Sequence, residues 1–211
     1  KITLISGTLT DYKLIKGIIV EQNIQHCFHL AAQVEVGVAI EYPLLTWDTN
    51  VRGTYTLLEA IRENKKNINS VIIASSDKAY GNYPKEKMPY LEDYPLMPRY
   101  PYDTSKACAD LIAQSYASEL YDIPIIITRF ANIYGPGQLN YSALIPDCIR
   151  SALGYTDFVP RSDGNQIRDL LYVKDIIKLY GLLSNSLSEN KDISGEVFNA
   201  GSDTPHLVKD V

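Results

Sequence analysis

Apolar residues in this chain occur either in short continuous runs or in stripes with a helical period. The continuous runs are rich in β-branched residues and predict buried strands of a parallel sheet at residues 1–6, 25–30, 68–76, 124–130 and 196–200. Apolar positions three or four residues apart predict helices at residues 11–21, 37–64, 101–121, 142–153 and 173–183. Strands that alternate with helices are typical of an α/β fold with helices on both faces of the sheet.

Other segments carry weaker patterns. The stretch 37–64 is interrupted at Pro43 and is most helical from 48 to 63. For the helix at 101–121 we expect a buried stripe of Cys108, Leu111, Ile112, Tyr116 and Leu120. A short strand near Phe158, a polar surface loop at 184–194 and a helix beginning at the chain's end complete the prediction. Residues 77–98 lack a period and predict a long loop; loops above ~12–15 residues are usually functional or disordered, so a substrate-side lid is plausible.

Chemically reactive side chains follow the strand at 68–76. Ser76, Asp77 and Lys78 emerge at its carboxyl end, where open α/β sheets bind ligands. Tyr102 and Lys106 begin a helix, and their i, i+4 spacing places them on one face. An ammonium group beside a phenol favours the phenolate, so we expect Lys106 to lower the pKa of Tyr102. The same spacing at residues 12/16 and 83/87 lacks this context and indicates a solvated face or a loop.

Composition excludes several classes of protein. The 211 residues carry a net charge of −5, which argues against nucleic acid or an anionic membrane as a partner. No apolar run approaches the ~20 residues that cross a bilayer. The separated cysteines Cys27, Cys108 and Cys148 indicate buried thiols of a cytoplasmic protein. The histidines show no metal-ligand spacing, so we expect no metal site.

Seven short motifs occur in order over nearly the whole chain: His-Leu-Ala-Ala-Gln at 29–33, Thr-Asn-Val-Arg-Gly-Thr at 49–54, Ser-Ser-Asp-Lys-Ala-Tyr-Gly at 75–81, Tyr-x-x-x-Lys at 102–106, Arg-Phe-Ala-Asn-Ile-Tyr-Gly-Pro-Gly at 129–137, Arg-Asp-Leu-Leu-Tyr-Val-Lys-Asp at 168–175 and Phe-Asn-Ala-Gly at 198–201. In these motifs and in their order the chain resembles the extended short-chain dehydrogenase/reductases that act on nucleotide sugars. The resemblance implies a Rossmann-like, doubly wound parallel sheet and NAD as the cofactor.

The family's glycine-rich turn does not occur, so the first βαβ portion of the fold is expected to be missing. On this basis residues 1–135 form part of an NAD-binding domain. Residues 136–211 form part of a small substrate-binding region with interleaved Rossmann elements. We expect the chain alone to bind NAD weakly or not at all.

The resemblance also implies roles for individual residues. Tyr102 is the base, Lys106 assists it, and Ser76 holds the substrate oxygen. The implied cofactor contacts are Thr8, Leu30, Ala31, Ala32, Thr49, Tyr102 and Lys106, and the implied substrate contacts are Ser76, Asn132, Arg168 and Asn199. Thr8 departs from the family's usual acidic residue, which puts the adenine contact in doubt. Asn50 either orders the active-site backbone or faces solvent, and Arg150 and Arg161 are interpreted as solvated charges.

Residues 77 and 78 decide the subclass. In nucleotide-sugar 4,6-dehydratases this pair supplies an acid and a base that eliminate water across C5 and C6. An Asp-Lys pair resembles the CDP-glucose 4,6-dehydratase branch and also some dehydratases of UDP-N-acetylhexosamines. Lys78 can act as a base only if its pKa is lowered; otherwise it is a structural ion-pair partner, for example of Asp77. The alternatives are a nucleotide-sugar 4-epimerase and a non-catalytic dinucleotide-binding fragment. Family members commonly dimerise through the helices that contain Asn50 and Tyr102, so we expect a homodimer.

Overall fold

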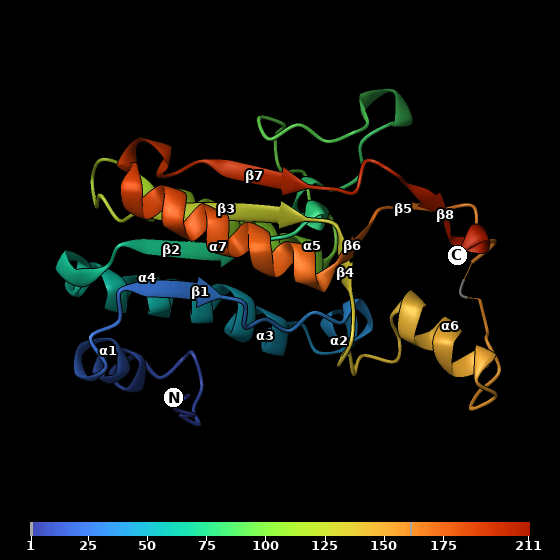
Figure 1. Ribbon diagram of the computed structural model, residues 1–211, viewed down its shortest axis with the longest axis horizontal. Helices are drawn as coiled ribbons and strands as arrows, with labels where there is room; N and C mark the ends of the chain where they lie inside the picture. Colours follow the sequence, from blue (N-terminus) through green and yellow to red (C-terminus); the bar gives the residue numbers. More distant parts are fainter. Residues whose placement is uncertain (1, 161) are drawn as a thin grey trace. The chain divides into compact units, whose positions relative to one another are not determined.

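A computed structural model describes residues 2–160 and 162–211 (Figure 1). The chain divides into two compact units. Unit 1 holds the described residues up to Arg129 together with Gly181–Asn199, and unit 2 holds Phe130–Tyr180 and Ala200–Val211.

The main sheet contains four strands in the order β1 (His26–His29), β2 (Ser70–Ala74), β3 (Ile125–Phe130) and β7 (Val197–Ala200). β1, β2 and β3 pair in parallel register, and all four arrows point the same way in Figure 1. The parallel α/β fold predicted from the sequence is confirmed. The expected strand at 1–6 is wrong, because residues 2–6 pair with no described strand and Ile2 and Leu4 are 88% and 92% exposed.

Helices cover both faces of this sheet (Figure 1). α4 (Gly53–Glu63) and α5 (Pro101–Ala117) lie on one face, and the carboxyl-terminal half of α7 (Val173–Glu189) lies on the other. α1 (Tyr12–Glu21) begins as predicted, because the Asp11 carboxylate accepts a hydrogen bond of 3.1 Å from the Leu14 amide.

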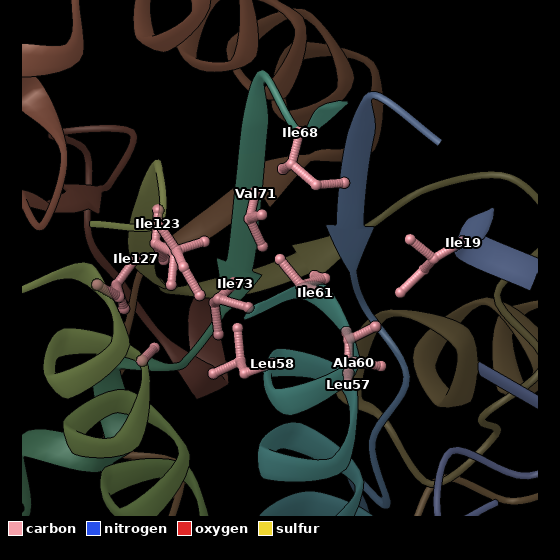
Figure 2. Close-up of a cluster of buried hydrophobic side chains, with 12 residues drawn as sticks. Ile19, Leu57, Leu58, Ala60, Ile61, Ile68, Val71, Ile73, Ile123 and Ile127 are labelled. Atoms are coloured by element: carbon pink, nitrogen blue, oxygen red, sulfur yellow. The ribbon is translucent and has the colours of Figure 1, made fainter. Parts of the chain in front are cut away.

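The buried core lies between the sheet and the helices α4 and α5 (Figure 2). Side chains of β2 and β3 alternate between the faces, so Val71, Ile73 and Ile127 point to these helices. Leu58 and Ile61 of α4 pack against them with no exposed surface. Since both faces are covered, β2 and β3 are almost entirely buried, which explains their continuous β-branched sequences.

The helical segment predicted at 37–64 with an interruption at Pro43 is divided into four pieces, and a break does occur before Pro43. These are α2 (Val36–Glu41), α3 (Pro43–Thr46), a π-helical turn η1 (Trp47–Arg52) and α4. Pro43 starts α3 at a position where its missing amide hydrogen costs no helical bond. A π-helical turn widens the backbone locally and is frequent at functional sites.

Two predictions for the helix at 101–121 are wrong. α5 ends at Ala117 rather than 121, because Ser118 turns to extended backbone and its hydroxyl bonds the Ser115 carbonyl at 2.7 Å. Leu111 and Leu120, expected in the buried stripe, are 55% and 74% exposed. The buried face of α5 consists instead of small and polar residues, namely Ser105, Lys106, Ala107, Ala109, Asp110 and Ala113.

The predicted surface loop at 184–194 is largely helix, since α7 continues to Glu189. Ser184 is buried, and its hydroxyl lies 2.6 Å from that of Ser70 and 3.2 Å from Nδ1 of His26. The buried side of this helical end therefore combines a serine hydroxyl with Leu183 and Leu187, which are 6% and 0% exposed. A short 3-10 turn, η5 (Lys191–Ile193), follows.

The described residues of unit 2 form two small sheets and one helix that belongs to this unit entirely. β4 (Asn132–Tyr134) pairs in parallel with β6 (Leu170–Tyr172), and β5 (Ile167–Arg168) pairs antiparallel with β8 (His206–Leu207). The helix is α6 (Leu144–Ala152).

Two further predictions fail in unit 2. Phe158 lies in no strand, because its described neighbours have no pairing partner. The end of the chain forms a 3-10 turn, η6 (Val208–Asp210), in place of the expected helix. Among the residues that the structure describes, no helix has the length and apolar character that a membrane span requires.

Candidate active site

The residues after β2 form a short, polar turn. Ser76 caps the 3-10 turn η3 (Asp77–Tyr80), with its hydroxyl accepting a bond of 3.2 Å from the Lys78 amide. The same hydroxyl donates to Oδ1 of Asp77 at 3.1 Å. Nζ of Lys78 lies 3.1 Å from Oδ2 of Asp77, and these two side chains are 38% and 23% exposed. The structure therefore joins the predicted acid and base in an ion pair.

Tyr102 lies on the first turn of α5, and its side chain is near enough to Ser76 to interact with it. Burial raises the pKa of Tyr102 to about 12, a change that the nearby Ser76 hydroxyl opposes and the Asp77 and Asp103 carboxylates reinforce. The expected lowering of this pKa by Lys106 is wrong for the chain by itself, because desolvation of the phenol dominates. The predicted base is thus held as a neutral hydroxyl beside Ser76.

Lys106 lies one turn after Tyr102 and is only 6% exposed. Its Nζ donates to the carbonyl oxygen of Ala74, the last residue of β2, at 2.8 Å. Burial lowers the pKa of Lys106 to about 8. The helix and the strand end are therefore joined through a buried amine.

Asn50 of η1 is 1% exposed and forms the centre of a hydrogen-bond network. Its Oδ1 accepts from the Gln33 amide at 2.7 Å, and its Nδ2 donates to the Gln33 carbonyl at 2.9 Å. Nδ2 also donates to the Ser105 hydroxyl at 2.8 Å, which donates to the Tyr102 carbonyl at 2.7 Å. The solvent-facing interpretation is wrong, because Asn50 holds the loop after β1 against the first turn of α5.

His29 extends this network, although the sequence marks it only as part of the motif at 29–33. Its Nε2 lies 2.8 Å from the Thr54 hydroxyl, which donates to the Asn50 carbonyl at 2.6 Å. Because Thr54 uses its proton on Asn50, Nε2 of His29 must be the donor. Burial, and to a lesser degree Lys106, lower the pKa of His29 to about 4, so this histidine is neutral at pH 7.

The predicted cofactor contacts that follow β1 lie at the same sheet edge as Ser76. β1 and β2 pair with His29 opposite Ile73, so Leu30, Ala31 and Ala32 follow β1 where Ser76 follows β2. Leu30 and Ala31 are exposed and Ala32 is half-buried, which leaves this backbone open to a ligand.

The other predicted cofactor contacts have different settings. Thr49 is half-buried in η1 beside Asn50. Thr8 lies in an exposed loop before α1, where its hydroxyl accepts a bond of 3.3 Å from the Thr10 amide.

The three other predicted substrate contacts lie on β4, β5 and β7. In unit 2, Asn132 is exposed on β4, and half-buried Arg168 on β5 donates to the Ile167 carbonyl at 2.9 Å. In unit 1, Asn199 accepts from the Tyr80 hydroxyl at 2.8 Å and donates to the Tyr90 carbonyl at 2.9 Å. These contacts give Asn199 a structural role, and its substrate contact stays a prediction.

Several remaining predictions concern single charged or thiol groups. The guanidinium of Arg150 lies 4.6 Å from the ring centre of Tyr141, and it is half-buried rather than fully solvated. Arg161 lies outside the described residues. The cysteines are free and half-buried rather than fully buried: Cys27, Cys108 and Cys148.

The family model described as NAD dependent epimerase/dehydratase family matches residues 1–201. CDP-glucose 4,6-dehydratase of Salmonella typhimurium is 33% identical over 153 residues, which cover 69% of this chain and 42% of that protein. The chain spans between 30% and 60% of the length of the curated relatives it matches.

Two solved structures share the fold over almost the whole chain. DesIV, a dTDP-glucose 4,6-dehydratase from Streptomyces venezuelae crystallised with NAD bound, is 26% identical with a TM-score of 0.84, covering 97% of this chain and 59% of that one. UDP-N-acetylglucosamine 4-epimerase from Methanobrevibacter ruminantium M1 is 31% identical with a TM-score of 0.86, covering 99% and 64%. The extent of the family match and the order of its motifs lead to one conclusion: the chain belongs to the NAD dependent epimerase/dehydratase family.

Proposed function

We propose that the protein containing this chain is an NAD-dependent nucleotide-sugar 4,6-dehydratase. The observation that carries the proposal is the geometry after β2, where Asp77 pairs with Lys78 within one short turn and the Tyr102 side chain lies beside Ser76. The first pair suits proton transfer at a hydroxyl that is being oxidised. The second pair adds the acid and base that elimination of water requires.

The proposed cofactor is NAD, and the residues present fit it. The exposed backbone and small side chains at 30–32 leave space beside Ser76, while Thr49, Tyr102 and Lys106 lie on the elements around that space. When bound, NAD takes up two electrons and a hydrogen from C4 of the sugar and later returns them. The pKa of Tyr102 should fall below its value in the chain alone once a cationic nicotinamide lies beside it.

The side chains then divide the proton transfers among them. Ser76 holds the C4 oxygen, and Tyr102 takes the proton of the C4 hydroxyl as that carbon becomes a ketone. Lys78 removes the proton on C5, and Asp77 gives a proton to the C6 hydroxyl, which leaves as water. The sugar regains a hydrogen at C6 and a proton at C5, so the net change is loss of one water.

The ion pair between Asp77 and Lys78 is compatible with this division. A carboxylate with an ammonium holds the same number of protons as a carboxylic acid with an amine. Transfer of one proton across the 3.1 Å between Nζ and Oδ2 converts the resting pair into the acid and base needed, with no change in net charge.

A 4-epimerase is the second candidate. The similarity to a UDP-N-acetylglucosamine 4-epimerase supports it, and so does the direct contact between Asp77 and Lys78, which a purely structural pair would also make. In that case the Ser76, Tyr102 and Lys106 set acts alone. A non-catalytic dinucleotide-binding role is disfavoured, because the chain keeps all three of these residues.

A CDP-hexose is the proposed substrate, on the strength of the Asp-Lys pair and the Salmonella relative. The test incubates the full-length protein with NAD and a panel of CDP-, dTDP-, GDP- and UDP-hexoses and follows the mass of each. Loss of one water from a CDP-hexose is expected. An unchanged mass with a new stereoisomer would instead make the protein an epimerase.

We further propose a homodimer in the cytoplasm. Exposed apolar side chains on α4 and α5 support the dimer, with Tyr55 44% and Leu111 55% exposed. Free cysteines fit a reducing compartment. Sedimentation of Leu111→Glu against the unchanged protein tests the interface, and the variant is expected to sediment as a monomer.

A further inference from the structure

The turn that carries Asp77 and Lys78 has little support of its own. It is four residues of 3-10 helix, closed by bonds from the Ala79 amide to the Ser76 carbonyl and from the Gly81 amide to the Lys78 carbonyl, each 3.0 Å. Short 3-10 segments have poorer hydrogen-bond geometry than an α-helix. Contacts outside the turn must therefore fix the direction of its two charged side chains.

Tyr80, the last residue of this turn, supplies such contacts. Its ring has no exposed surface, and two planar groups pack against it. The guanidinium of Arg129 is 4.7 Å from the ring centre, and the Tyr90 ring is stacked at 4.7 Å and 19°. The Tyr80 hydroxyl donates to Oδ1 of Asn199 at 2.8 Å. Residues from three separate parts of unit 1 thus converge on one ring.

Arg129, the first of these planar groups, is fixed to α5, the helix that carries Tyr102. Arg129 donates to both carboxylate oxygens of Asp110, at 2.8 and 2.9 Å, and both side chains are almost completely buried. Asp110 lies on α5 one turn after Lys106. A bidentate, buried pair of this kind has a single geometry. Arg129 therefore transmits the position of α5 to the ring of Tyr80.

Tyr90, the second planar group, lies in the long loop at 81–99. The Tyr90 hydroxyl donates to the Gly81 carbonyl at 2.8 Å, and the Met97 amide donates to the Tyr80 carbonyl at 3.1 Å. Gly81 has φ +76°, and a Cβ there would lie 2.0 Å from the Met97 carbonyl oxygen. The loop at 81–99 therefore packs against Tyr80, and Tyr80 in turn supports the loop.

We propose that Tyr80 is a positioning residue for the Asp77–Lys78 pair, held by its contacts with Arg129 and Tyr90 so that this pair keeps a fixed relation to Tyr102 on α5. The inference rests on the proposed function, because it assigns the elimination of water to that pair. Tyr102 and Lys106 lie on α5, and Lys106 is fixed by its bond to the Ala74 carbonyl, so neither depends on the Tyr80 ring. Loss of the Tyr80 ring should therefore affect elimination more than oxidation at C4.

The test compares Tyr80→Leu with Tyr83→Leu in the full-length protein. Both changes remove a tyrosine of the same region, but Tyr83 contacts Tyr90 and Tyr94 rather than the buried turn. Tyr80→Leu is expected to slow water loss by about 100-fold, the cost of a displacement near 1 Å in a catalytic group. Formation of reduced cofactor in a single turnover should stay within about threefold. Tyr80→Phe, which keeps both stacking contacts, should restore most of the activity.

A second measurement does not depend on catalysis. Trypsin cleavage after Lys78, followed by mass spectrometry, should be about tenfold faster in Tyr80→Leu because the turn opens locally, and unchanged in Tyr83→Leu. Equal losses of oxidation and elimination, or unchanged cleavage, would overturn the proposal. If the unchanged protein removes water from no sugar nucleotide, the proposed function fails while cleavage still decides the role of Tyr80. If Tyr80→Leu does not fold, Tyr90→Leu removes the stacked ring instead. Slower water loss and faster cleavage after Lys78 are again expected.

Discussion

The two polar regions beside Tyr102 differ in how their side chains are held. In the Asn50 network, which comprises His29, Gln33, Asn50, Thr54 and Ser105, hydrogen bonds join β1, the loop after it, η1, α4 and α5. His29, Asn50, Thr54 and Ser105 are buried. In the turn after β2, the charged groups of Asp77 and Lys78 are partly exposed and pair mainly with each other. The first region determines where Tyr102 and the loop after β1 lie. The second can change its charges without disturbing the fold, as acid and base catalysis requires.

Tyr102→Phe should give the largest effect of all the changes. It should lower the activity and leave the stability unchanged. The change removes the hydroxyl beside Ser76 that accepts the substrate proton in the proposed function, while the ring continues to fill its buried site. Loss of a general base typically costs about 10² to 10⁴ in rate. Steady-state turnover of the full-length protein and its urea unfolding curve are the two measurements. A turnover within about tenfold of the unchanged protein would remove Tyr102 from the chemistry.

Asn50→Ala should instead destabilise the fold. Three hydrogen bonds disappear, and the Gln33 backbone and the Ser105 hydroxyl lose buried partners, which should cost about 2 to 4 kcal/mol in the free energy of unfolding. The matched control is Asn67→Ala, since Asn67 makes one exposed bond of 3.2 Å to Asn23. Urea denaturation monitors both variants. Equal, small losses would mean that water replaces the amide of Asn50.

The sequence predicts the turn after β2 better than it predicts the Asn50 network. Ser76 and Tyr102 can be placed together because one ends a buried strand and the other starts the next helix. Asn50 cannot be placed, because its partners Gln33 and Ser105 are 17 and 55 residues away and the π-helical turn depends on that packing. The raised pKa of Tyr102 escapes prediction for the same reason, since burial is a tertiary property that residue spacing does not report.

The sequence also predicts some strands and helices better than others. Runs of β-branched residues predict β2 and β3 correctly because both faces of these strands are covered. The hydrophobic pattern predicts a loop for the end of α7, although Leu187 is fully buried there, because the serines and asparagines around it give the segment a polar composition. Residues 2–6 have a strand-like sequence but no neighbouring strand in the described part of the chain.

A fall in pH should destabilise the fold through the Asn50 network, because His29 is buried there in its neutral form. Its pKa is about 4 in the folded chain and near 6.5 when exposed, so the unfolded state binds more protons between these values. Stability is therefore lost as pH falls through this window, by about 2 kcal/mol between pH 7 and pH 5. Urea unfolding at the two pH values measures the loss. His29→Gln should remove that part of the pH dependence, and an identical dependence in the variant would show that other groups cause it.

Lys78→Met should have the smallest effect on stability and so provide the sharpest contrast. The change removes an ion pair whose lysine is 38% exposed, and partly exposed pairs contribute at most about 1 kcal/mol. The methionine side chain retains the contacts of the lysine stem, so the unfolding midpoint in urea should hardly move. Water loss from the sugar nucleotide should nevertheless fall by about 10² or more, because no other base in the turn can take the C5 proton. A large drop in stability with unchanged water loss would reverse the comparison, making Asp77 and Lys78 a structural pair and favouring the epimerase.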